Sequence, residues 1–177
     1  MPARAAVKRA AKPKAPPKVS PLEVRFARQL LEAGLAWDGW DVTWCDAVGA
    51  PLERTRTDFL FRLSRGRWRA VAVEIEGGGY VRGRHHREPG YSQDCGKYNR
   101  MGLAGVLLLR GTETLLRDET LLGCVRLALV GRKSSRADLA RCRKQLDLKE
   151  SQLEARAVYD KARAAEARAK RKGAAGD

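Results

Sequence analysis

Two strand-like runs joined by a short turn constrain the fold of this chain more than any other feature of its sequence. Residues 57–63 and residues 68–76 are rich in apolar residues, and the four residues between them, SRGR, have Gly66 near their centre. Apolar runs separated by a short glycine-containing turn predict a β-hairpin. A turn centred on Gly66 pairs each residue of the first strand with the residue equally far from Gly66 on the second.

Three carboxylates share one face of this predicted hairpin. Side chains alternate between the two faces of a strand, so Glu74 and Glu76 point the same way, and Asp58 lies directly across from Glu74. Like charges at contact distance raise one another's pKa or require a cation. Mg²⁺ prefers oxygen ligands and takes one or two carboxylates with substrate phosphate, so we expect a Mg²⁺ site here, with Mn²⁺ as a substitute. The alternative is that the acids are solvated or paired with the many nearby arginines.

A helix is expected before the hairpin, and a strand between the two. Ser20, Pro21 and Glu23 have the spacing of an N-cap, a first-turn proline and a capping-box glutamate. Apolar residues then continue at helical spacing to Gly34. Tryptophan and valine alternate with polar residues over residues 40–44, which predicts a half-buried strand.

A long connection follows the hairpin. Residues 77–93 contain five glycines, three arginines and the only two histidines of the chain. Connections of this length are uncommon unless they are functional or disordered. The helix expected to open at Ser92 or Gln93 carries Asp94 and Lys97 on one face, because residues three apart are neighbours on a helix.

The pattern as a whole predicts one α/β domain over residues 19–131. An apolar run at residues 106–109 is typical of a buried strand, and a further helical pattern ends at Gly131. Residues 135–172 are rich in Ala, Arg, Lys and Glu and lack Gly and Pro, which predicts a long charged helix. Its leucines at seven-residue spacing are interrupted by polar positions, so we expect a solvated helix that lies on nucleic acid or frays, rather than a coiled coil.

Most of the net charge of +15 lies outside that domain. Residues 1–18 carry six bases and no acid, residues 132–177 carry fourteen bases and seven acids, and the rest carries sixteen bases and fourteen acids. We expect a disordered basic arm at the N-terminus, since its prolines and lack of serine disfavour an organelle transit peptide. Basic segments attract phosphates whatever the sequence, so a polyanionic partner is expected, with a membrane surface as the weaker alternative.

Composition also excludes several classes of protein. No stretch approaches the roughly 18 uninterrupted apolar residues of a membrane span, so we expect no transmembrane segment. The four cysteines have no C-x-x-C spacing and no apolar leader precedes the domain, so neither a zinc ribbon nor a secreted disulfide framework is predicted. We expect reduced thiols and a cytoplasmic location.

The segment from residue 57 to residue 112 resembles the small PD-(D/E)xK endonucleases, especially their Vsr-like, phage and prophage type. The motifs E-x-E-G-G, G-R-H and D-C-x-K-Y-N carry the resemblance in that order. The match as a whole extends over residues 22–112, beyond the segment that holds the motifs. It implies a restriction-endonuclease-like core, a mixed sheet with a central β-hairpin flanked by helices. It also implies a Mg²⁺-dependent DNA endonuclease of a bacterial or phage-infected cell, active in nicking, repair, recombination or phage DNA processing on double-stranded or branched DNA.

The resemblance also implies roles for individual residues. Asp58 matches the first catalytic aspartate and Glu74 the acid of the (D/E)xK element, while Glu76 stands where the family usually has lysine. Lys97 matches the lysine that in some relatives has migrated to the following helix. For phosphate contacts, Arg84 and His85 of the G-R-H element are the strongest candidates, and further candidates in the connection are Arg82 and Arg87. Independently of the resemblance, the alternation of Arg65, Arg67 and Arg69 along the hairpin predicts contacts with the nucleic-acid backbone, and the alternative is an ordinary solvent-facing strand of arginines. The alternative function is a non-catalytic nucleic-acid-binding protein derived from a nuclease fold.

Overall fold

Among the described residues the sheet has four strands, with the predicted hairpin in its middle. The structure is a computed structural model that describes residues 15–43, 56–77 and 90–173. The strand order is β1-β2-β3-β4, in which β1 and β3 run antiparallel to β2, and β4 runs parallel to β3. The strands are β1 (Gly39–Thr43), β2 (Arg56–Arg62), β3 (Ala70–Glu76) and β4 (Val106–Thr112). The predicted α/β class with a mixed sheet is confirmed.

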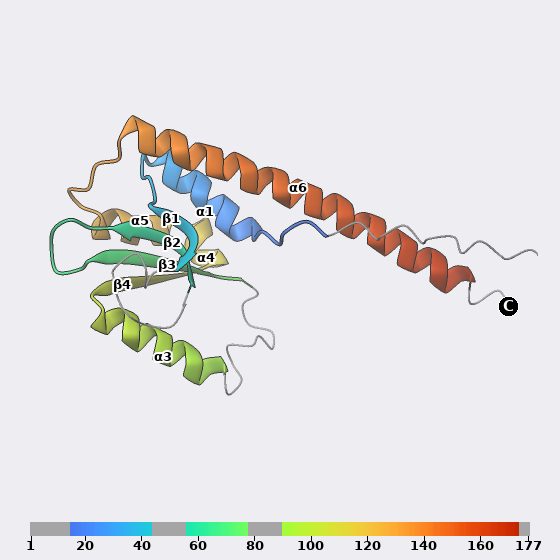
Figure 1. The fold of residues 1–177 in the computed structure, drawn as a ribbon, viewed down its shortest axis with the longest axis horizontal. Helices are drawn as coiled ribbons and strands as arrows, with labels where there is room; N and C mark the ends of the chain where they lie inside the picture. Colours follow the sequence, from blue (N-terminus) through green and yellow to red (C-terminus); the bar gives the residue numbers. More distant parts are fainter. Residues whose placement is uncertain (1–14, 44–55, 78–89, 174–177) are drawn as a thin grey trace, which may run out of the picture. The chain divides into compact units, whose positions relative to one another are not determined.

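Helices cover both faces of this sheet (Figure 1), with α3 on one face and α1, α4 and α5 on the other. The helices are α1 (Pro21–Glu32), α3 (Gly90–Leu103), α4 (Glu113–Arg117), α5 (Thr120–Ala128) and α6 (Arg136–Gly173). Across the described ranges, no helix has both the length and the apolar character needed to cross a membrane.

The β2–β3 hairpin has the register that its sequence predicts. Gly66 lies in the turn with a φ of +102°, a left-handed conformation that glycine adopts without steric cost. The ladder pairs Phe59 with Val73 and Leu60 with Ala72, so each pair is symmetric about Gly66. Strand β3 begins at Ala70 rather than at residue 68, because the turn takes up two more residues than expected.

The two faces of the sheet bury different cores. Towards α1, the ring of Phe59 lies edge-on to Phe26 at 5.4 Å and to Trp37 at 5.6 Å, and stacks on Trp40 at 5.0 Å, measured between ring centroids. All four rings are buried. Towards α3, a smaller cluster consists of Leu60, Ala70, Ala72, Met101 and Val106. The aromatic rings therefore lie on one face of the sheet, and the cluster that contains Met101 lies on the other.

Several element boundaries differ from the sequence predictions. Helix α3 begins at Gly90, two residues before the earliest predicted start, and β4 continues to Thr112. The short helix α4 was not predicted; it follows β4 directly because the Thr112 hydroxyl accepts a hydrogen bond from the Leu115 N–H at 3.4 Å and caps it. Helix α5 corresponds to the helix predicted to end at Gly131, but it stops at Ala128.

The first turns of α6 belong to the packed domain, so the expectation of a wholly solvated helix is wrong. The compact unit that contains the sheet spans Val19–Glu150 and extends past the predicted boundary at residue 131. Cys142 and Leu146 are buried. The indole N–H of Trp37 donates to Gln145 Oε1 at 2.7 Å, and the Arg141 guanidinium donates to the Trp37 carbonyl at 3.0 Å. These contacts attach the start of α6 to the segment before β1.

The second unit combines residues 1–18 with residues 151–177. In its described part, the Arg156 guanidinium donates to the Pro16 carbonyl at 3.1 Å and pairs with Asp160 at 2.9 Å. Most side chains described after residue 153 are exposed, which agrees with the predicted solvated, charged character of this part of the helix.

We predict that Trp37→Ala lowers the free energy of unfolding by about 3–5 kcal/mol, because it removes a buried aromatic ring and its hydrogen bond to α6. Urea denaturation followed by circular dichroism measures this. Leu127→Ala is the control, since that side chain is 77% exposed and its loss should change stability by no more than about 0.5 kcal/mol. Equal losses in the two variants would contradict the role given to Trp37.

Candidate functional site

Asp58 and Glu74 lie on neighbouring strands, close to the start of β2 and the end of β3, on the sheet face covered by α3. Phe59 is paired with Val73, so the next residues along the ladder are Asp58 and Glu74, and both are half-buried. The backbone N–H of Ile75 donates to Asp58 Oδ2 at 2.6 Å, which fixes this carboxylate against β3. The two acids therefore meet where the predicted hairpin register places them.

The environment of Asp58 disfavours its ionised form. Burial is the largest cause and raises the pKa of Asp58 from 3.8 to about 7, while the Ile75 N–H opposes the rise. The negative charges of Glu23 and Glu74 raise this pKa further, and the positive charge of Lys97 lowers it. A cation bound beside the carboxyl would stabilise its ionised form and reverse the shift.

Lys97 of α3 lies directly against Glu74. Its Nζ donates to Glu74 Oε1 at 2.8 Å and to the Arg56 carbonyl at 2.8 Å. The two side chains of this ion pair are only 14% and 17% exposed. Burial still raises the pKa of Glu74, although the hydrogen bond from Lys97 lowers it. Lys97 thus faces the acids, as its predicted helix face requires, and its catalytic role stays a prediction.

Glu76 pairs with an arginine to which the sequence analysis assigned no role. Arg110 donates from Nε and Nη2 to Glu76 Oε1 at 2.8 Å and 2.6 Å, and its guanidinium carbon lies 4.6 Å from the centroid of the Tyr98 ring. The pair forms because β4 runs parallel to β3, with Arg110 beside Glu74 in the register. The only sequence signal was an arginine directly after the apolar run 106–109.

Glu23 contributes to the site from α1. Its backbone N–H donates to the Ser20 hydroxyl at 3.4 Å, which is the first half of the predicted capping box. Its carboxylate accepts a hydrogen bond from the Trp40 indole N–H at 2.9 Å, which turns it away from the N-cap backbone. The negative charge of Glu23 is also one of the causes that raise the pKa of Asp58.

The remaining predicted residues fall in three places. Asp94 lies on α3 one turn before Tyr98, whose pKa burial raises to about 12, with smaller contributions from neighbouring acids that include Asp94. Three arginines lie in or beside the hairpin turn, at the end of β2 and β3 opposite to Asp58, namely Arg65, Arg67 and Arg69. The predicted phosphate-binding residues of the connection lie outside the described residues: Arg82, Arg84, His85 and Arg87.

The acids of this site suit a hard divalent cation. Asp58 and Glu74 supply carboxylate oxygens from adjacent strands, and Mg²⁺ commonly takes one or two carboxylates and keeps several waters. Within the described ranges, no group of three or more His, Cys, Asp or Glu side chains is arranged to hold a metal ion. The structure therefore offers a pair of carboxylates, with Glu76 held beside them by Arg110. Metal binding by these residues stays a prediction.

Comparison with known proteins assigns no family to this chain. No family model, no curated protein and no solved structure matches it. The function must therefore be inferred from the chemistry of the site.

We predict that Asp58→Asn stabilises the protein more at pH 8 than at pH 5. The folded-state pKa of Asp58 is raised to about 7 from 3.8, so its contribution to stability is fully present below about pH 4 and is lost as the pH rises through about 7. The variant's advantage in unfolding free energy should grow by roughly 2 kcal/mol between these two pH values, as measured by urea denaturation.

Asp118→Asn is the control for this prediction. Hydrogen bonds from Thr120 lower the pKa of Asp118, so its carboxylate is ionised at both pH 5 and pH 8. The effect of this substitution on stability should be the same at the two pH values. A pH-independent effect of Asp58→Asn would contradict the raised pKa.

Proposed function

We propose that this chain is a metal-dependent DNA endonuclease with a restriction-endonuclease-like core. One observation carries the proposal: two half-buried carboxylates, Asp58 and Glu74, lie side by side on adjacent strands, with the Lys97 ammonium 2.8 Å from Glu74. Carboxylates are a poor environment for phosphate unless a cation accompanies them. In a chain of net charge +15, a half-buried acid pair with a lysine favours a site that binds a cation and a phosphodiester together.

Asp58 and Glu74 are the residues that would hold the cation, Mg²⁺ or its substitute Mn²⁺. Oδ2 of Asp58 is engaged by the Ile75 N–H, so Oδ1 is the oxygen available to a ligand. A bound divalent cation supplies Lewis-acid polarisation of the phosphodiester. The burial that raises the pKa of both acids also strengthens their attraction for a cation, because charges interact more strongly away from water.

Lys97 and Glu76 would act on the substrate. The Lys97 ammonium is held by Glu74 and the Arg56 carbonyl, so it is positioned in advance to stabilise negative charge that develops on the phosphate. Glu76 would orient the attacking water or accept its proton. Arg110 fixes the Glu76 carboxylate through two hydrogen bonds to Oε1.

A non-catalytic nucleic-acid-binding protein is the second candidate, and the ion pairs favour it. Glu74 and Glu76 are each compensated by a cation of the protein itself, Lys97 and Arg110 respectively. A carboxylate whose negative charge is already balanced by a side-chain cation attracts a metal ion less strongly. In this case the basic segments would still bind DNA, and no Mg²⁺-dependent strand cleavage would be observed.

We predict that the full-length protein cleaves DNA only when Mg²⁺ is present and that Asp58→Asn abolishes cleavage. The test incubates the protein with supercoiled, branched and single-stranded DNA, with Mg²⁺ or with EDTA, and follows the products on gels. Binding of the same DNA is measured in EDTA. Binding by the parental protein without cleavage of any of the three substrates would support the non-catalytic candidate.

We further predict that Lys97→Ala lowers the cleavage rate by roughly 10²–10³, the effect of removing one electrostatic stabiliser of the transition state. DNA affinity should stay close to that of the parent, because Lys97 is one cation among many. Lys144→Ala is the matched control, since this lysine is exposed on α6 and should leave the rate unchanged. Cleavage by Lys97→Ala at the parental rate would remove Lys97 from the mechanism.

A further inference from the structure

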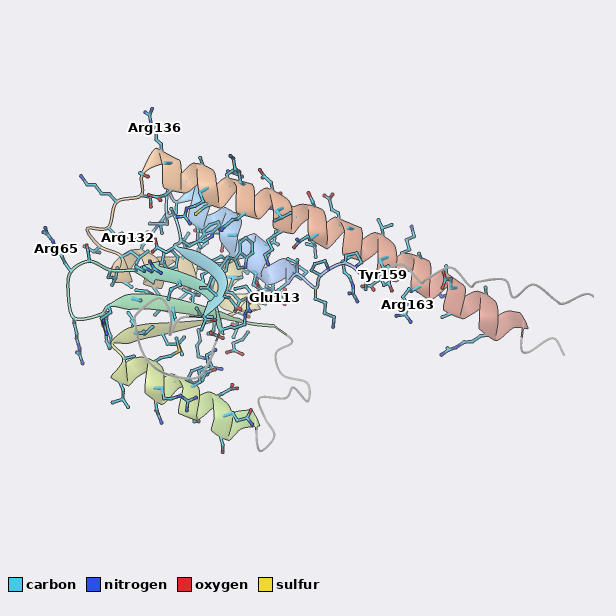
Figure 2. The ribbon with its side chains drawn as sticks, viewed as in Figure 1. Arg65, Glu113, Arg132, Arg136, Tyr159 and Arg163 are labelled. Carbon is cyan, nitrogen blue, oxygen red and sulfur yellow. The ribbon has the colours of Figure 1, made fainter. Side chains whose placement is uncertain are left out.

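The turn of the β2–β3 hairpin presents a cluster of exposed arginines at the end remote from the acid pair. Arg65, Arg67 and Arg69 are exposed, and Figure 2 shows the Arg65 side chain pointing away from the sheet. No carboxylate in the described part of the chain forms an ion pair with any of the three. We name these residues the turn arginines.

The backbone that carries the turn arginines is held firmly. The Leu63 N–H donates to the Arg69 carbonyl at 2.9 Å, and the Arg69 N–H donates to the Gly105 carbonyl at 2.8 Å, which ties the turn to the start of β4. The guanidinium of Arg67 lies 5.0 Å from the centroid of the Trp68 ring, a cation–π contact that limits its motion. Guanidinium groups ordered before binding lose less conformational entropy when they bind a ligand.

A neighbouring arginine at this end of the domain is already occupied. Arg132 pairs with Asp38 at 2.9 Å, and its guanidinium lies over the Phe61 ring at 5.6 Å. Figure 2 shows it at the same end of the domain as Arg65. The guanidinium of Arg132 is therefore used within the fold. The guanidinium groups of the turn arginines, in contrast, have no acidic partner among the described residues.

The turn arginines are too far from the acid pair to contact the same phosphates. Arg69, the nearest along the chain, is five residues from Glu74, roughly 17 Å in an extended strand, and Arg65 is seven residues from Asp58, roughly 20 Å. Asp58 and Glu74 lie at the open end of the hairpin, and the turn lies at the closed end. The turn therefore forms a surface separate from the candidate catalytic site.

We propose, on the basis of the DNA-directed function proposed above, that the turn arginines form a second phosphate-binding surface, which binds a stretch of nucleic-acid backbone other than the stretch at the acid pair. Arginine suits this role because its planar guanidinium donates two parallel hydrogen bonds to phosphate oxygens. A membrane surface is a poorer partner, because the turn offers no exposed apolar side chain for insertion and Trp68 is half-buried.

The test measures DNA binding in the full-length Asp58→Asn chain, so that it is independent of cleavage. Arg65, Arg67 and Arg69 are replaced together by Gln, and affinity for a duplex of about 30 base pairs is measured over a range of salt concentrations. The slope of log affinity against log salt should fall by about 2 to 3, since each phosphate contact contributes about 0.9. An unchanged slope would overturn the proposal.

A matched control separates the turn from net charge. Arg25, Arg117 and Arg126 are exposed on α1, α4 and α5, and replacing all three by Gln removes the same charge. This variant should keep a slope within about 1 of the parent. An equal fall in both variants would assign the effect to overall charge and overturn the proposal.

A second measurement tests whether the turn binds a separate stretch of DNA. One duplex is immobilised, and capture of a second, labelled duplex through the Asp58→Asn protein is recorded. The parent and the control variant should capture the labelled duplex, and the turn variant should lose most of this capture. Equal capture by the turn variant, or no capture by the parent, would overturn the second surface.

Discussion

Antiparallel pairing of β2 with β3 about Gly66 assigns every side chain in the middle of the sheet to one of two faces. Phe59 and Val73 fall on the face of the aromatic core, whereas Asp58 and Glu74 fall on the face of α3. A slip of one residue would exchange the faces and bury the carboxylates among tryptophan and phenylalanine rings. The aromatic packing therefore secures the register, and the register brings the acids together.

Each acid at the strand ends is compensated by a different kind of group. Asp58 accepts a backbone N–H, Glu74 accepts from the Lys97 ammonium, and Glu76 accepts from the Arg110 guanidinium. These partners offset the cost of removing carboxylates from water, but Asp58 forms no ion pair with a cation of the described residues, and burial raises its pKa to about 7. Asp58, beside Glu74, is therefore the acid of this site that a bound cation would stabilise most.

Local periodicity explains what the sequence could predict here. The alternation of strand residues about Gly66 was sufficient to predict that Asp58 lies beside Glu74. The three-residue spacing of Asp94 and Lys97 was sufficient to predict the face of α3 on which Lys97 lies, and Lys97 contacts Glu74. Arg110 was missed because its pairing with Glu76 depends on the parallel placement of β4, which no local pattern encodes. The burial of Cys142 was missed for the same reason, since its partner Trp37 lies 105 residues away in the sequence.

The attachment of α6 to Trp37 has a consequence for how this chain reaches its native state. The hydrogen bonds of this attachment join residues 104 and 108 positions apart, and a further one joins Ala36 to Ser134, 98 positions apart. The described strands and all the candidate acids precede α6, yet until its first turns dock, Trp37 lacks the hydrogen-bond partners that α6 supplies. A nascent chain at that stage would expose aromatic surface and would be prone to self-association, because the residues that close this core follow the segment they cover by about a hundred positions.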